Sequence, residues 1–299
     1  MNVEQELQGL LQARVKRNEP MSLHTSWQVG GPADYFVTPA DLSDTREIVR
    51  YCNRNKIPLT VIGRGSNLLV KDGGIRGMVL EIGEPFCYLH WEDNRLTSGA
   101  GTPMPYLVRT AARKGMAGLE FAGGIPGTLG GALIMNAGAF GSYIGNVVRE
   151  VTVVRQDGSV ATLEREEINF GYRHSSLSEE GIVVEAVLEL TKGDPAALER
   201  KVDFYLEERR RRHPQLPSAG SVFRNLPGCP AGRLIEAAGG KGLRIGNAQV
   251  SEMHANFIVN LGGATAADIY SLIEKVRRLV KEKFDVDLQP EVKVIGEEK

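Results

Sequence analysis

The spacing of hydrophobic and polar residues along the chain predicts short strands mixed with a few longer helices. Apolar residues recur at helical intervals in 42–55, 104–114, 195–212 and 265–284, and in 1–20, where the pattern predicts a charged amphipathic helix. Alternating or β-branched runs predict strands at 34–38, 58–62, 150–155, 160–163, 182–190, 221–224, 256–260 and 290–295, with further short strands within 68–82. The pattern therefore indicates a protein with both helices and strands, and 34–62 predicts a βαβ-like start.

Two of these predictions carry local detail. The turn at 156–159 (Gln-Asp-Gly-Ser) should join two strands as a hairpin. In the helix at 265–284, Thr265 can cap the N-terminus and Asp268 lies in the first turn. One face of that helix is apolar and should be buried in a core; it consists of Ile269, Leu272, Ile273, Val276, Leu279 and Val280.

Composition excludes several classes of protein. The chain has 299 residues, of which 42% are hydrophobic and 24% charged, with a net charge of −1. These values are those of a globular protein of about two domains, and they argue against disorder and against a general nucleic-acid binder. No apolar run reaches the ~20 residues that span a bilayer, so we expect no membrane insertion.

The N-terminal twenty residues lack the apolar core and cleavage site of a secretory signal. Cys52, Cys87 and Cys229 have no paired spacing, which indicates neither a disulfide framework nor a zinc ribbon and favours a reducing cytoplasm. The five histidines also lack the spacing of metal ligands, so we expect no metal site.

Glycine is abundant and clustered. The chain has 35 glycines, and two clusters stand out, GRGSN at 63–67 and GGIPGTLGGALIMNAGAFG at 123–141. Glycine-rich turns can present successive main-chain N–H groups to an anion such as a pyrophosphate, although tight turns in a β-rich domain would have the same composition. Leu68 stands where a GxGxxG motif needs its third glycine, and no P-loop is present, so a bound dinucleotide would require another scaffold.

Several ordered motifs resemble one family. WQVGGPA at 27–33, GRGSNLLV at 63–70 and AGGIPGTLGGALIMNAGAFG at 122–141 are similar to the flavin-binding half of the UDP-N-acetylenolpyruvoylglucosamine reductase family. Downstream, the similarity continues in order through GYR at 171–173, SAGSVFRN at 218–225, AGRLIEAAGGKGLRIGNAQVS at 231–251 and QPEVKVIG at 289–296. The compact length resembles the short subtype, which lacks an extra substrate-closing loop. Leu226 and Asn256 depart from the usual residues, proline and often glycine.

This resemblance implies a two-lobed, non-Rossmann FAD-binding domain of the vanillyl-alcohol-oxidase type and a smaller α+β substrate-binding domain. The implied division is 1–83 and 84–193 for the two FAD-binding lobes and 194–288 for the substrate domain. A C-terminal strand at 289–299 would return to the first lobe. The implied reaction is reduction of UDP-N-acetylglucosamine enolpyruvate to UDP-N-acetylmuramate for peptidoglycan synthesis, with FAD as cofactor and NADPH as reductant.

The resemblance also implies which residues bind the cofactor. They come from the two glycine clusters, and we expect neither a covalent flavin link nor a second dinucleotide site. The set is Gly63, Arg64, Gly65, Ser66, Asn67, Gly123, Gly124, Ile125, Pro126, Gly127, Thr128, Gly130, Asn136, Gly138 and Ala139.

Three residues match the family's catalytic positions. Arg173 could hold the substrate carboxylate with two parallel hydrogen bonds. Glu291 would be useful beside that carboxylate mainly in its neutral form, in which it can donate a hydrogen bond. Ser221 matches the proton donor, which would act on the strongly basic carbanion left by hydride addition. By residue type alone, each could equally be a solvated surface group, or a turn serine in the case of Ser221.

The implied substrate-binding residues are Tyr172, Arg212, Asn225, Lys241 and Gln249. Arg212 ends a run of four arginines that could equally be a solvated helix end. Two other functions stay open: another FAD-dependent oxidoreductase of this fold that acts on a small alcohol, and a nucleotide-sugar-binding protein without catalysis. The sequence does not set the oligomeric state.

Overall fold

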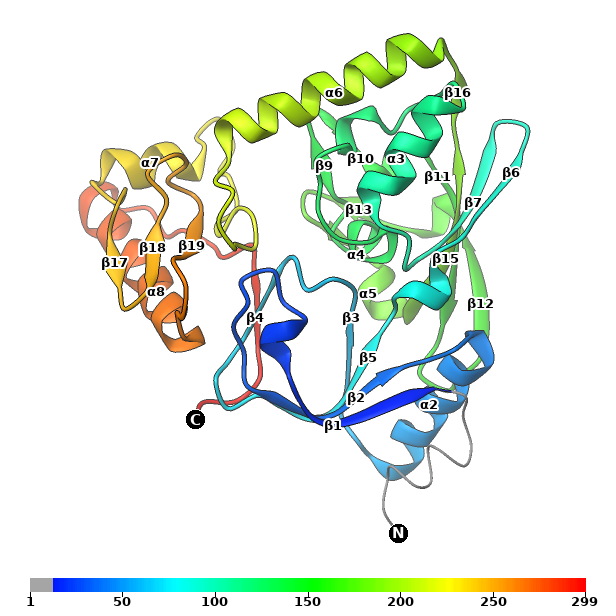
Figure 1. Cartoon of the computed structure of the whole chain (residues 1–299), viewed down its shortest axis with the longest axis horizontal. Coiled ribbons are helices and arrows are strands. Elements are labelled where there is room, and N and C mark those ends of the chain that lie inside the picture. Colours follow the sequence, from blue (N-terminus) through cyan, green and yellow to red (C-terminus); the bar gives the residue numbers. More distant parts are fainter. Residues whose placement is uncertain (1–12) are drawn as a thin grey trace. The chain divides into compact units, whose positions relative to one another are not determined.

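The computed structural model describes residues 13–299, which form two compact units (Figure 1). Within this range, unit 1 comprises 13–17, Tyr35–Arg64 and Gly77–Glu208. Unit 2 comprises Asn18–Asp34, Gly65–Arg76 and Arg209–Lys299. Four elements run from one unit into the other: β1 (Arg14–Pro20), β2 (Pro32–Thr38), β5 (Ile75–Glu81) and α6 (Pro195–Arg212).

Unit 1 is built around an antiparallel sheet with the order β12-β11-β15-β7-β6. A parallel sheet would be needed for a Rossmann fold, so the expected non-Rossmann scaffold is confirmed. The elements of unit 1 are α2 (Leu42–Asn55), β3 (Leu59–Ile62), β6 (Leu89–Glu92), β7 (Arg95–Gly99), α3 (Met104–Arg113), β8 (Met116–Ala117), α4 (Leu129–Ile134), β9 (Gly138–Ala139), β10 (Ser142–Tyr143), β11 (Val148–Val154), β12 (Val160–Glu164), β13 (Phe170–Gly171), β14 (His174–Ser175), α5 (Leu177–Glu180), β15 (Ile182–Glu189) and β16 (Thr191–Lys192).

The hydrophobic pattern explains how unit 1 closes. On α2, Ile48, Val49 and Cys52 are buried, and the side chain of Asp41 caps the helix by accepting a hydrogen bond from the Asp44 N–H at 2.8 Å. These residues join the sheet in one hydrophobic cluster. The predicted hairpin at 156–159 is confirmed, because β11 and β12 pair antiparallel on either side of it.

Unit 2 surrounds one long helix. Its elements are β4 (Leu68–Val70), α7 (Ala231–Ala237), β17 (Arg244–Ile245), β18 (Ala248–Val250), β19 (Ile258–Asn260), α8 (Ala266–Phe284) and β20 (Lys293–Ile295). The predicted cap of α8 is confirmed, because Thr265 and Asp268 form a reciprocal capping box. All members of its apolar face are buried except Leu279, which is partly buried.

A segment far upstream is part of this unit. β20 pairs parallel with β4, so the end of the chain lies beside residues 68–70. In the loop that follows β4, the carboxylate of Asp72 accepts hydrogen bonds from the N–H groups of Ala266 and Ala267, at 3.0 and 2.8 Å. Residues 65–76 are therefore bonded both to the start of α8 and to β20.

Two sequence predictions are wrong. Residues 14–20 form strand β1 and not the end of an amphipathic helix, while 1–12 lie outside the described residues. Residues 221–224 form no regular strand; Phe223 makes an isolated bridge with Pro290. In both cases the conformation depends on hydrogen-bond partners from other parts of the chain. A local hydrophobic pattern does not contain that information.

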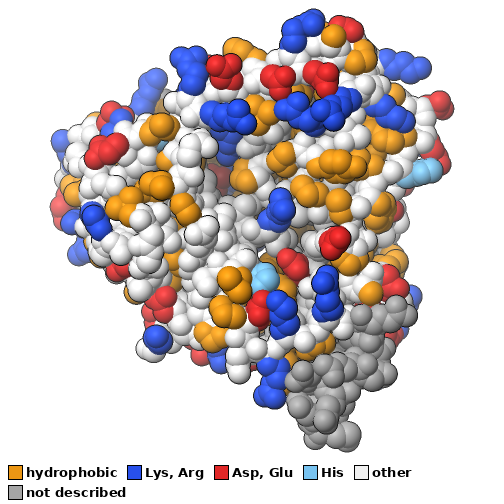
Figure 2. All heavy atoms as spheres, viewed as in Figure 1, with side chains coloured by type: hydrophobic (Ala, Val, Ile, Leu, Met, Phe, Trp, Pro, Cys, Tyr) orange, Lys and Arg blue, Asp and Glu red, His pale blue; other side chains and the backbone are white. Residues whose placement is uncertain are grey.

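The surface is chemically mixed. On the face drawn in Figure 2, basic and acidic side chains are interspersed, as expected from a net charge of −1. Among residues 13–299, no helix is both long and apolar enough to cross a bilayer.

Candidate functional site

In unit 1, Gly63 of the first glycine cluster meets the second cluster. A β-carbon added to Gly63 would lie 2.6 Å from Oγ1 of Thr128, so the backbone passes directly over that side chain. Thr128 is buried and caps α4, with its hydroxyl accepting a hydrogen bond from Gly131. The structure thus brings together residues that the sequence separates by more than sixty positions.

The second cluster follows the backbone after β7 closely. Leu129 and Gly130 donate main-chain hydrogen bonds to Thr102 and Ala100, at 2.9 and 2.8 Å. A β-carbon on Gly130 would stand 3.0 Å from that of Ala100. At Gly127 a φ of +102° favours glycine directly. These glycines are therefore required by backbone geometry.

Part of this cluster offers unused hydrogen-bond donors. Within residues 13–299, no hydrogen bond is donated by the main-chain N–H of Gly124 or Gly127. Both glycines are only partly buried, as is Ile125, and Pro126 is exposed. Free N–H groups in a glycine-rich turn fit an anionic ligand such as the diphosphate of FAD.

The remaining predicted cofactor residues of this cluster have defined structural places. Asn136 is buried at a φ of +41°. Its Oδ1 accepts from the N–H of Gly145 at 3.1 Å, and its Nδ2 donates to the carbonyl of Gly171 at 2.9 Å. Gly138 and Ala139 form β9, and Gly123 is buried beside Val202. Asn136 therefore links the glycine-rich segment to the loop that carries Arg173.

Arg173 lies in the turn between β13 and β14, within unit 1. It is half-buried, with its guanidinium carbon 5.2 Å from the ring centre of Tyr172. Its φ of +53° is unfavourable for a residue with a side chain, and such strain is concentrated at functional sites. Tyr172 is 43% exposed, so it lies at the surface of unit 1.

In unit 2 the first glycine cluster packs against a different segment. Gly65 is buried at a φ of +57°, and a β-carbon there would overlap the carbonyl of His24. The Gly65 carbonyl accepts a hydrogen bond from the N–H of Ser26 at 3.2 Å. Arg64 is exposed and Ser66 is half-buried on either side of it. Only glycine fits at position 65.

The structure brings Asn67 to Glu291. Nδ2 of Asn67 donates to the Glu291 carbonyl at 3.2 Å, and the Asn67 carbonyl accepts from the N–H of Lys293 at 3.0 Å. A predicted cofactor-binding residue is thus directly bonded to the main chain of a predicted catalytic residue, which lies just before β20.

Ser221 lies next to the same segment. The N–H of Glu291 donates to the carbonyl of Val222 at 2.7 Å. Ser221 is half-buried, and its hydroxyl makes no hydrogen bond with any residue in 13–299. Within residues 13–299 the hydroxyl is therefore not used as a helix cap or turn bond.

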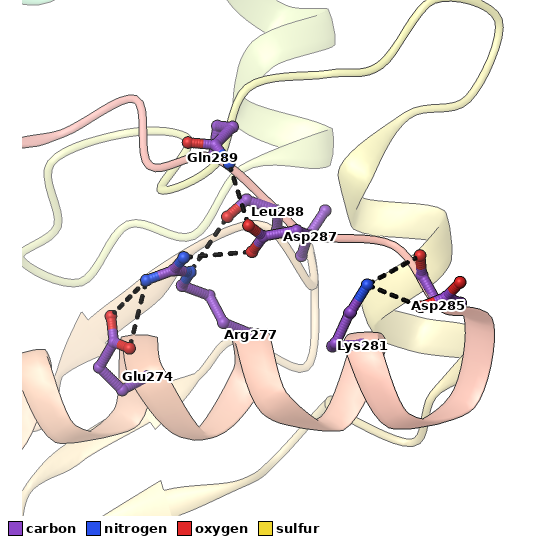
Figure 3. Close-up of polar contacts among 7 residues, drawn as sticks. All are labelled: Glu274, Arg277, Lys281, Asp285, Asp287, Leu288 and Gln289. Atoms are coloured by element: carbon purple, nitrogen blue, oxygen red, sulfur yellow. Dashed lines mark hydrogen bonds and ion pairs between the residues drawn. The ribbon is translucent and has the colours of Figure 1, made fainter.

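The chain before Glu291 is held by α8 (Figure 3). Arg277 donates from Nε to the Leu288 carbonyl and from a terminal nitrogen to Asp287, both at 3.1 Å. Another terminal nitrogen of Arg277 donates to Glu274 at 3.0 Å. The hydrogen bonds with Glu274 and Asp287 raise the pKa of Arg277, so its guanidinium stays charged. It therefore holds the stretch of chain that leads to Glu291.

The predicted substrate-binding residues of unit 2 already have partners. Oδ1 of Asn225 accepts from the N–H of Ala231 at the start of α7, at 3.0 Å. Lys241 forms an ion pair with Glu236 at 2.8 Å, and Gln249 donates to the Gly242 carbonyl at 3.4 Å. Arg212 is exposed at the end of α6. A ligand that binds to these side chains would either add to their present hydrogen bonds and ion pairs or replace them.

Sequence reasoning missed a half-buried cluster of two histidines in unit 2. The rings of His213 and His254 lie 5.5 Å apart and both contact Phe257. Burial, with further contributions from Arg209 and His254, lowers the pKa of His213 to about 4. Burial also lowers the pKa of His254, whose Nδ1 accepts a hydrogen bond from the N–H of Asn256 at 3.2 Å. Both rings are therefore neutral near pH 7, and neither sequence spacing nor composition indicated the cluster.

Comparisons with known proteins show a similar family and fold. Residues 33–164 match a family described as "FAD binding domain", and residues 212–295 match the C-terminal domain of UDP-N-acetylenolpyruvoylglucosamine reductase. The UDP-N-acetylenolpyruvoylglucosamine reductase of Heliobacterium modesticaldum is 52% identical over 94% of this chain and 90% of its own length. That of Desulforamulus reducens is 45% identical over 98% of this chain and 97% of its own.

A solved structure is also similar. The crystal structure of UDP-N-acetylenolpyruvylglucosamine reductase from Thermus caldophilus matches with a TM-score of 0.83 and 37% identity, over 94% of this chain and 99% of the other.

Proposed function

The chain belongs to the UDP-N-acetylenolpyruvoylglucosamine reductase family, and from that premise we propose that it reduces UDP-N-acetylglucosamine enolpyruvate to UDP-N-acetylmuramate. It would do so as an FAD-containing oxidoreductase with NADPH as reductant, in the synthesis of peptidoglycan precursors for the cell wall. The observation that carries the proposal is the similarity to these reductases over nearly the whole chain, at 52% identity in one case. The three cysteines are free, which supports a cytoplasmic location.

The glycine-rich segments would hold the cofactor. The N–H groups of Gly124 and Gly127 fit its diphosphate, and the close approach of Gly63 to Thr128 leaves no room for a side chain there. When bound, FAD supplies the hydride that reaches the terminal vinyl carbon of the substrate. We propose that the other residues of 63–67, 123–130, 136 and 138–139 named above line the same cofactor.

Arg173 and Glu291 would stabilise the charge that follows. Hydride addition leaves an electron pair on the adjacent carbon, delocalised into the substrate carboxylate. Arg173 can donate two parallel hydrogen bonds to that carboxylate, and a protonated Glu291 can donate another. Tyr172 lies beside Arg173 with an exposed ring that can cover the substrate.

Ser221 would complete the reaction. Its hydroxyl has no hydrogen-bond partner among residues 13–299, so it can give its proton to the carbanion carbon and form the new C–H bond. The resulting alkoxide regains a proton from solvent. We propose that the nucleotide sugar is bound by Arg212, Asn225, Lys241 and Gln249. The division into FAD-binding lobes 1–83 and 84–193 and a substrate domain 194–288 also stays part of the proposal.

A single assay tests the proposal. NADPH oxidation by the purified yellow protein should depend strongly on UDP-N-acetylglucosamine enolpyruvate, with UDP-N-acetylglucosamine as the control that lacks the double bond. Oxidation of NADPH that ignores the enolpyruvyl substrate, with turnover of a small alcohol instead, would indicate a different flavin enzyme. A colourless protein that binds the nucleotide sugar would indicate a binding protein without catalysis.

A further inference from the structure

The side chain of Asn256 exchanges two hydrogen bonds with the backbone of Phe223. Oδ1 of Asn256 accepts from the Phe223 N–H at 2.9 Å, and Nδ2 donates to the Phe223 carbonyl at 2.8 Å. The main-chain carbonyl of Asn256 accepts from the N–H of Val222, also at 2.8 Å. Both Asn256 and Phe223 are almost fully buried, with 2% and 1% exposure. Two consecutive residues after Ser221 are thus bonded to one asparagine.

This arrangement replaces a missing strand pair. A residue in an antiparallel ladder exchanges an N–H···O bond in each direction with the residue opposite. Phe223 makes that exchange with an amide side chain, because residues 221–224 form no regular strand. The amide of Asn256 therefore acts as a substitute peptide group at this position.

The opposite edge of the segment is bonded to the chain around Glu291. The N–H of Glu291 donates to Val222 at 2.7 Å, and the N–H of Arg224 donates to Gln289 at 2.9 Å. Residues 222–224 are therefore held from both sides, by Asn256 on one and by 289–291 on the other. Ser221 immediately precedes this fixed segment, and Gly220 before it has a φ of +77° that a side chain would strain.

Asn256 is itself fixed. Its N–H donates to Nδ1 of His254 at 3.2 Å, and the hydroxyl of Ser251 accepts from the N–H groups of Met253 and His254 at 3.1 and 3.4 Å. Burial keeps His254 neutral near pH 7, so its Nδ1 can accept this bond. The loop that carries Asn256 is consequently rigid enough to impose a position on its partner.

We infer that Asn256 is a positioning residue for the protonation step: by bonding both polar groups of the Phe223 backbone, it sets the place of the Ser221 hydroxyl relative to Glu291. The inference rests on the proposed function, in which Ser221 delivers the proton. Among residues 13–299, the side chain of Asn256 forms hydrogen bonds only with the main chain of Phe223, so it takes no part in hydride or proton transfer itself. Its loss would leave the buried N–H and C=O of Phe223 without partners, and the segment would shift to satisfy them.

The expected effect is selective. Misplacement of a reacting group by about 1 Å can slow a step by roughly 100-fold. Asn256→Ala, and Asn256→Asp, which keeps an acceptor but loses the donor, should slow reoxidation of the reduced flavin by substrate roughly 10- to 100-fold. Reduction of the flavin by NADPH should be unchanged, because that step needs no proton from Ser221.

Asn260 provides a matched control in the same unit. It is 4% exposed, its Nδ2 donates to the Trp27 carbonyl at 2.9 Å, and its Oδ1 accepts from Gly262 and Ala264. The side chain of Asn260 makes no hydrogen bond with residues 221–224, and its main-chain bond to the Pro217 carbonyl is retained in Asn260→Ala. Asn260→Ala should therefore lower the melting temperature as Asn256→Ala does, without removing a bond to the Ser221 segment. Any general loosening of unit 2 would appear in both variants.

The test is a rapid-mixing measurement of each half-reaction on FAD-saturated protein, in H₂O and D₂O. The inference predicts that the Asn256 variants slow only the second half-reaction and raise its solvent isotope effect, because proton transfer becomes more rate-limiting. It is overturned if both half-reactions slow equally, or if Asn260→Ala gives the same selective loss. A wild-type protein that NADPH reduces but the enolpyruvyl substrate never reoxidises would instead overturn the proposed function. If Asn256→Ala does not fold, the same two half-reactions measured on the near-isosteric Asn256→Asp test the inference.

Discussion

Oγ1 of Thr128 lies 2.6 Å from the point that a β-carbon on Gly63 would occupy. The first glycine of one cluster therefore rests on the residue that caps α4 in the other cluster. This contact is short enough that even the smallest side chain at Gly63 would displace Thr128.

From this contact we predict that Gly63→Ala weakens FAD binding roughly tenfold, since overpacking costs about 1–3 kcal/mol. Flavin retained on purification and FAD titration by fluorescence measure the effect. Gly131→Ala is the matched control, because its β-carbon would meet Thr128 only at 3.8 Å and nothing closer. Equal FAD affinity in the two variants would show that the contact is not part of the cofactor site.

Ser221→Ala should separate the two half-reactions completely. Reduction of the flavin by NADPH should be retained, and reoxidation by substrate should fall by roughly 10²- to 10⁴-fold, which is the usual contribution of a positioned acid. Ser218→Ala, in the same loop, should leave both rates unchanged. If Ser221→Ala slowed both half-reactions to the same extent, the serine would be structural.

Glu291→Gln should change the pH dependence of activity. A neutral Glu291 donates a hydrogen bond, and at higher pH it would ionise and repel the substrate carboxylate. The amide of glutamine cannot ionise, so the alkaline decline in kcat/KM should disappear in the variant, at a lower maximum rate. Glu298→Gln, at the exposed C-terminal end, is the control. A pH profile unaltered by Glu291→Gln would contradict the proposed role.

Asp72→Ala should destabilise unit 2 through α8. Asp72 accepts two hydrogen bonds from the first residues of the helix, Ala266 and Ala267, and losing a cap costs about 0.5–2 kcal/mol. Hydrogen exchange of those two amides should accelerate, with a smaller change in Asp72→Asn, which keeps one acceptor oxygen. Unaltered exchange at the start of α8 would mean that the Thr265 capping box alone fixes the helix.

The burial of His213 makes stability depend on pH. Its pKa is lowered from 6.5 to about 4 in the folded protein, so the unfolded chain binds more protons between those two values. Stability should therefore fall as pH is lowered from 6.5 toward 4, and it should fall less in His213→Gln. Thermal melts across this window measure the slope, with His90→Gln on the exposed hairpin as control. Parallel slopes in His213→Gln and the wild type would contradict the prediction.

The sequence by itself determined most of the local structure. The periodic residues of 42–55, 195–212 and 265–284 form helices at those positions, because their pattern matches the helical repeat and their caps are local. The ordered motifs also identified the family and the FAD-binding and reductase regions that the comparisons match.

Only the tertiary structure decided which distant residues meet. It paired β20 with β4, placed Asp72 at the start of α8 and bonded Asn67 to Glu291. It also folded 14–20 as a strand and left 221–224 irregular, with Asn256 supplying the missing partner. The physical reason is that hydrophobic periodicity and caps act over a few residues. Backbone partners such as these are chosen by the whole fold, because every buried N–H and C=O must be satisfied wherever the chain brings a partner.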